Sequence, residues 1–266
     1  MEVTDLLGYV GALLIGLVLG LIGGGGSILT VPILVYLLLV NPVLATAYSL
    51  FVVGVTAAVG TLRNIPKKII DWRTAIVFSI PAFIAVYIAR KFIVPGIPEE
   101  LFYVGETVIT KDLAIMVFFA VVMLLASISM IRKKKERKVA EGDQKFNYPI
   151  IILEGMGVGM VTGIVGAGGG FLIIPALVIL ANLPMKKAVA TSLLIIAVKS
   201  LIGFIGDVEN LTIDWRFLLS FTGLSVIGIF MGIYLNQFID GKKLKKAFGW
   251  FVLVMGIYIL YKEIVA

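Results

Sequence analysis

The chain has 266 residues, of which 60% are hydrophobic and only 15% are charged, whereas soluble domains carry about 25% charged residues. Its apolar stretches are long and lack period-two alternation, so the composition excludes a soluble domain and predicts an all-α integral protein of the cell membrane. The sequence contains no cysteine and no histidine, which removes thiol chemistry and histidine metal ligands and argues against an enzyme or a cofactor site.

Ten apolar segments, taken in chain order, predict transmembrane or half-spanning helices. The first five lie at 5–22, 27–40, 43–62, 74–94 and 108–131. The second five lie at 149–165, 170–182, 187–206, 217–235 and 247–262. The N-terminus lacks a basic region and a small-residue cleavage site, so we expect the first segment to be a retained span and not a signal peptide.

The chain also contains an internal repeat at a spacing of 143 positions. Residues 71–73, Asp-Trp-Arg, recur as residues 214–216, and Gly23 aligns with Gly166. Chance similarity between apolar stretches would match Leu, Ile, Val and Ala rather than Gly, Trp, Asp and Arg. Duplicated halves of this length are typical of transporters, so the repeat predicts two related sets of five helices.

Basic loops predict how these repeats are oriented. The expected organisation is a first transmembrane repeat at 1–131, a linker at 132–147 and a second repeat at 148–266. Cytoplasmic loops are rich in Lys and Arg, so the linker, which begins RKKKERK, is expected in the cytoplasm. Both termini and the acidic loop near 99–106 then fall outside. Because each repeat has five spans, the second repeat enters the membrane in the opposite orientation to the first, and the repeats are inverted. The two Asp-Trp-Arg motifs should therefore cap their helices at opposite faces of the membrane.

The net charge of +7 reflects these basic loops and does not indicate nucleic-acid binding.

Each repeat contains a glycine run, at 23–26 and at 166–170. The 14 residues from Ser27 to Val40 rise about 21 Å as a helix, whereas the hydrocarbon core is about 30 Å thick. Each run is therefore expected to lie inside the membrane as the hinge of a broken, re-entrant helix. Irregular backbone at that depth must be packed in protein or line a cavity. Close helix packing is the alternative role for these glycines.

The helix that follows each glycine run is expected to attract an anion, because its first N–H groups are unpaired and carry the positive end of its dipole. Lys199 lies within an apolar segment and aligns with the neutral Thr56, so it is a candidate counter-charge. Alternatively, Lys199 reaches the surface or pairs with Glu154 or Asp207. Glu154 is a candidate for proton coupling, or it is simply exposed. The candidate substrate-binding residues are Gly24, Gly25, Gly26, Ser27, Ser49, Gly168, Gly169, Gly170, Thr191, Ser192 and Lys199.

The motif GLIGGGGSILTVP with ATAYSL, and the motif TGIVGAGGGFLIIP with AVATSL, resemble the paired signatures of the TauE/SafE family of sulfite and organosulfonate permeases. The resemblance covers nearly the whole chain. It implies secondary transport of sulfur oxyanions or small organosulfonates, commonly as export, with proton coupling open. It also implies that residues 23–27 and 166–170, with Ser49 and Ser192, match the family motifs. The chain departs from the common pattern at Tyr48, which aligns with Thr191 in the second half.

The expected function is therefore secondary transport of sulfite or a similar anion by alternating access, without a cofactor or a metal. The expected partners are a small anionic substrate and membrane lipids, and the oligomeric state stays open. Two alternatives use the same scaffold: an anion channel, or a permease for another small carboxylate or oxyanion. A membrane anchor or assembly subunit is a further alternative, in which the glycine runs would form a dry helix contact.

Overall fold

The computed structural model of the chain describes residues 3–104, 107–131, 148–166, 168–179, 183–236, 238–239 and 241–265. Within this part the protein is all-α apart from one short β-hairpin. Its elements are α1 (Val3–Ile22), α2 (Gly26–Pro32), η1 (Ile33–Leu37), α3 (Pro42–Asn64), α4 (Trp72–Ile88), η2 (Ala89–Ile93), α5 (Val94–Gly96), β1 (Glu100–Val104), β2 (Thr107–Thr110), α6 (Lys111–Ile131), α7 (Tyr148–Val165), α8 (Gly170–Ile179), α9 (Met185–Val208), α10 (Trp215–Leu235) and α11 (Gly241–Val265). The expected linker at 132–147 lies outside the described residues.

Five helical segments of the described chain are long and apolar enough to cross a membrane: Pro42–Asn64, Trp72–Gly96, Lys111–Ile128, Lys186–Val208 and Trp215–Leu235. Three shorter apolar helices accompany them, at Leu7–Ile22, Ile28–Leu37 and Ile151–Val165. Each of the ten apolar segments expected from the sequence contains a helix. The protein is therefore an all-α, multi-pass membrane protein.

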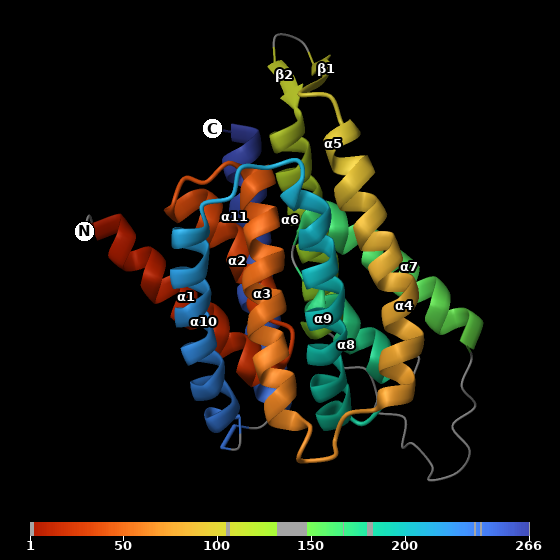
Figure 1. Cartoon of the computed structure of the whole chain (residues 1–266). Coiled ribbons are helices and arrows are strands. Elements are labelled where there is room, and N and C mark those ends of the chain that lie inside the picture. Colours follow the sequence, from red (N-terminus) through yellow and green to blue (C-terminus); the bar gives the residue numbers. More distant parts are fainter. Residues whose placement is uncertain are drawn as a thin grey trace.

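The helices of the two halves are interleaved. The long helices α3 and α9 pack against each other, α1 packs against α10, α4 packs against α7, and α6 packs against α11. Figure 1 shows that α4 begins at the lower end of the bundle, whereas α10 begins at the upper end. The helices α1 and α7 lie obliquely to the upright helices that they contact. The first and fourth helices of each half therefore pack against the other half.

Glycine permits close contact where α1 and α7 cross their partners. A Cβ atom on Gly16 of α1 would overlap the carbonyl of Ser225 in α10, and a Cβ atom on Gly159 of α7 would overlap Ala82 in α4. Gly159 lies 143 positions after Gly16, and Ser225 lies 143 positions after Ala82, so equivalent positions of the repeat form both contacts. Small residues let membrane helices approach closely, so the two crossings are built from the same type of packing.

The acidic segment before α6 forms a β-hairpin, where the sequence predicts only a loop. The strand β1 pairs antiparallel with β2, with Tyr103 opposite Val108. The Tyr103 hydroxyl donates to the Glu100 carboxylate at 2.8 Å. Strands of four or five residues give too short an alternation to stand out beside the long apolar segments. The hairpin lies at the same end of the bundle as the start of α10 (Figure 1).

Candidate functional site

Both glycine runs interrupt helices in the same way. The last residue of α1 and the last residue of α7 are each followed by a glycine with positive φ, which is +77° at Gly23 and +70° at Gly166. Glycine adopts this conformation without a steric penalty. The Gly23 N–H donates to the Leu19 carbonyl at 2.7 Å, and the Gly166 N–H donates to the Thr162 carbonyl at 2.9 Å. The two helices thus end with equivalent turns.

The two glycine runs contact each other. A Cβ atom on Gly24 would lie 2.5 Å from the carbonyl carbon of Gly170, and a Cβ atom on Gly170 would overlap Gly24. Both residues are buried. The backbones therefore leave no room for a side chain at this point, and a ligand between Gly24 and Gly170 would require the two runs to separate.

The other candidate residues of the glycine runs surround this contact. Gly25 precedes α2 without a side-chain cap, and Gly26 packs against α1, where a Cβ atom would lie 2.9 Å from the Cβ of Leu19. In the second run, φ is +48° at Gly168 and +68° at Gly169. Ser27 lies in the first turn of α2, but its side chain is outside the described part of the chain.

Lys199 of α9 is fully buried beside the second glycine run. Its Nζ donates to Thr162 Oγ1 at 2.6 Å, and a Cβ atom on Gly169 would lie 2.6 Å from this Nζ. Among the described residues, no carboxylate lies within 4.0 Å of Lys199 Nζ. The alternatives in which Lys199 reaches the surface or pairs with Glu154 or Asp207 are therefore wrong. A fully buried lysine amine without a carboxylate partner among the described residues is left at the second run.

The two matched serines have different environments. Ser192 Oγ lies 3.0 Å from the Gly23 carbonyl and 2.8 Å from a carbonyl of its own helix, so it holds α9 against the first glycine run. Ser49 occupies the equivalent position in α3, is fully buried, and has no hydrogen-bond partner for its Oγ among the described residues. It lies one turn from Thr46, against which Gly166 packs. The free hydroxyl is therefore near the second run.

Thr191 holds the start of a helix of the other half. Its Oγ1 accepts the backbone N–H of Asp71 at 3.0 Å. At the equivalent position of the first half, the Tyr48 hydroxyl accepts the backbone N–H of Asp214 at 2.8 Å. Each aspartate also caps its own helix, as the Asp-Trp-Arg motifs predict. Tyr48 and Thr191 are different residue types, but each supplies a hydroxyl oxygen that accepts the equivalent hydrogen bond.

Arg90, which lies in η2, was not identified by sequence reasoning. Its side chain is fully buried. Its Nε lies 2.7 Å from both carboxylate oxygens of Asp207, and its Nη1 donates to Thr46 Oγ1 at 2.9 Å and to the Gly163 carbonyl at 3.3 Å. Its Nη2 has no hydrogen-bond partner within the described chain. The available signal was an arginine inside the apolar segment 74–94, where a charge is expensive.

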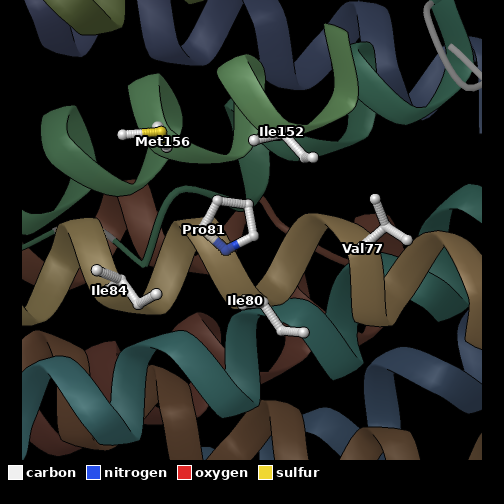
Figure 2. Close-up of a pocket in the computed structure, with 6 residues that line it drawn as sticks. All are labelled: Val77, Ile80, Pro81, Ile84, Ile152 and Met156. Carbon is white, nitrogen blue, oxygen red and sulfur yellow. The ribbon is translucent and has the colours of Figure 1, made fainter. Parts of the chain in front are cut away.

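Two further features lie away from the glycine runs. Glu154 is half-buried in α7 and forms no hydrogen bond or ion pair with the described residues. A groove of about 390 Å³ lies between α4 and α7 (Figure 2) and is lined by Val77, Ile80, Pro81, Ile84, Ile152 and Met156. All six lining side chains are apolar, so the groove suits a hydrocarbon chain rather than an anion.

Comparisons with known proteins cover almost the whole chain. The family model described as "Sulfite exporter TauE/SafE" matches residues 9–259. The chain is similar to a "Probable membrane transporter protein" of Xylella fastidiosa (strain 9a5c), with 26% identity over 255 residues, 94% of this chain and 92% of that protein. It is also similar to "Probable membrane transporter protein YunE" of Bacillus subtilis, with 26% identity over 279 residues, 95% of this chain and 96% of that protein. No solved structure matches.

Proposed function

We propose, since the chain belongs to the TauE/SafE family, that it is a secondary transporter which exports sulfur oxyanions or small organosulfonates such as sulfite. Its family and its relatives make it a membrane transporter and not an enzyme. The observation that carries the anionic substrate is Lys199, which is fully buried and has no carboxylate partner among the described residues. A buried cation of this kind is costly unless an anion neutralises it.

The proposed substrate site lies at the second glycine run. The helix α8 begins at Gly170, so the positive end of its dipole adds to the charge of Lys199. The glycines at 24–26 and 168–170, with Ser27, form the surrounding backbone, and the unpaired Ser49 hydroxyl is the free donor. Ser192 and Thr191 contribute by positioning, because their oxygens already bond to backbone groups of the first half.

The transport mechanism that we infer is alternating access of two inverted five-helix repeats, 1–131 and 148–266. Reciprocal contacts support this, because Thr191 binds the start of α4 and Tyr48 binds the start of α10. Those two helices begin at opposite ends of the bundle (Figure 1). Halves that exchange equivalent contacts can also exchange two equivalent conformations, which is how inverted repeats expose a site to each side in turn.

The orientation that follows places the linker 132–147 in the cytoplasm and both termini outside. The absence of cysteine from the sequence allows a direct test with single introduced cysteines. A cysteine in the linker should react with an impermeant maleimide only from the cytoplasmic side, whereas one at Thr107 in the hairpin should react only from outside. The reverse labelling would refute the orientation.

Flux in proteoliposomes tests the function. We expect saturable counterflow of radiolabelled sulfite that thiosulfate or small sulfonates inhibit. Sulfite, thiosulfate and sulfonates that neither move nor compete would refute the substrate class, and single-channel conductance would instead support an anion channel. For proton coupling, a pH gradient should stimulate the wild-type protein but not Glu154→Gln, while counterflow at equal pH stays unchanged. Equal stimulation of both proteins would remove Glu154 from the mechanism.

A further inference from the structure

Arg90 connects helices of both halves at the second glycine run. It lies in the π-helical turn η2, and such turns are frequent at functional sites. Its guanidinium contacts Thr46 in α3, Gly163 in α7 and Asp207 in α9. Thr46 is also the residue against which Gly166 packs. The guanidinium therefore reaches the edge of the second glycine run.

Part of this guanidinium is buried without a partner. Arg90 Nη2 has no hydrogen-bond acceptor among the described residues, although a guanidinium carries five N–H donors that normally find partners when buried. The buried hydroxyls of Ser49 and Ser200 also lack hydrogen-bond partners among the described residues. Ser200 directly follows Lys199 in α9. Unpaired donors of this kind fit a ligand that brings several acceptor oxygens.

Three buried charges gather around the last turn of α7. Lys199 Nζ donates to Thr162, and Arg90 Nη1 donates to the next residue, Gly163. Asp207 pairs with Arg90 at 2.7 Å. With Lys199 protonated and Asp207 ionised, two cations and one carboxylate leave this cluster with one excess positive charge. An anion of charge −1 would neutralise it, whereas a dianion would leave a buried negative charge.

The first glycine run forms the same backbone turn without these charges. The positions equivalent to Arg90, Lys199 and Asp207 in the other half are occupied by Ile233, Thr56 and Asn64. The turn at Gly23 nevertheless has the φ angle and the helix-terminating hydrogen bond of the turn at Gly166. Charged side chains are therefore not required to form the break, which favours a role in binding.

We propose that Arg90 binds the substrate together with Lys199, and that Asp207, by neutralising one of the two cations, makes the site selective for monovalent oxyanions over divalent ones. Sulfonates and hydrogen sulfite then fit, and sulfate does not. Two cationic donor groups can bind two oxygens of one anion, which favours an oxyanion over a halide. This inference rests on the proposed function, because it takes Lys199 to face the substrate.

Competition in proteoliposomes tests the inference. Methanesulfonate and sulfate should both compete with the counterflow of radiolabelled sulfite by the wild-type protein. The inhibitory concentration of methanesulfonate should be at least about tenfold lower, because bound sulfate leaves one buried charge unneutralised and bound methanesulfonate leaves none. Asp207→Asn installs the residue of the equivalent position, Asn64, and should shift this ratio toward sulfate by about tenfold or more. Arg90→Ile combined with Asp207→Asn should bind both anions more weakly while keeping the preference for methanesulfonate.

The control is Glu209→Gln, which removes the same charge from an exposed residue paired with Lys91 at 3.1 Å and should leave the ratio unchanged. An unchanged ratio in Asp207→Asn, or a wild-type preference for sulfate, would overturn the inference while leaving the proposed function intact. A wild-type protein without sulfite counterflow would overturn both. If Asp207→Asn does not fold, thermal denaturation of the wild-type protein tests the inference instead. Methanesulfonate must then raise the wild-type melting temperature more than sulfate does at equal ionic strength.

Discussion

Replacing Lys199 with threonine separates a binding role from a structural one. The substitution gives α9 the residue that occupies the equivalent position of α3, Thr56, so the helix receives a side chain that already fits this kind of environment in the other half. It removes the buried ammonium that donates to Thr162 at 2.6 Å. We expect weaker anion binding and unchanged or higher stability.

The size of the binding effect follows from burial. A unit charge about 4 Å from an anion contributes about 4 kcal/mol at an effective dielectric constant of 20, and a hydrogen bond to a charged group contributes about 1.5–3 kcal/mol net. The two values describe the same attraction and are not added, and residual hydration lowers the first, so we expect a loss of about 2–3 kcal/mol. This corresponds to an affinity for sulfite about 30- to 150-fold lower.

The stability of the folded protein should stay the same or rise. Among the described residues, the fully buried Lys199 has only the neutral acceptor Thr162, and a buried uncompensated charge is costly. Lys199→Thr should therefore melt at the same temperature as the wild-type protein or higher in detergent, while sulfite raises its melting temperature less. Counterflow measures the affinity, and thermal denaturation with and without sulfite measures the stability. A lower melting temperature with unchanged sulfite affinity would refute the reasoning and make Lys199 structural.

Two further predictions concern the packing around the site. Gly166→Ala should destabilise the protein by about 1–3 kcal/mol in thermal denaturation, because its φ of +70° disfavours a side chain and the added methyl overlaps α3. Gly157→Ala is the control, since a Cβ there meets nothing within 4 Å, and an equal loss in both would contradict the packing argument. Thr191→Val should cost about 1–3 kcal/mol, because it leaves the Asp71 N–H without its acceptor. Ser220→Ala, which removes an exposed hydroxyl bonded only to its own helix, should be neutral, and a neutral Thr191→Val would show that the bond to α4 is dispensable.

Much of the fold could be predicted from long-range features of the sequence. The length of the apolar segments predicts where helices lie. The glycines aligned at a spacing of 143 positions predict both backbone turns, because a positive φ excludes most other residues. The partners of the charged side chains could not be predicted. Arg90 lies near the end of an apolar segment, where an arginine ordinarily reaches toward the membrane surface. Its burial depends on α3, α7 and α9 meeting at one place, which no local pattern encodes.

The difference between the two glycine runs bears most directly on the mechanism. The backbone turn at Gly23 is matched by that at Gly166, and the contact of Thr191 with α4 is matched by that of Tyr48 with α10. If the buried charges served to hold this arrangement, they would be needed at both glycine runs. They lie at the second run only, with Arg90 from the first half and Lys199 and Asp207 from the second, and they carry the cost of burial without completing a symmetric contact. We therefore propose that the duplicated backbone provides the scaffold, whereas the cations at the second run provide the affinity for an anion.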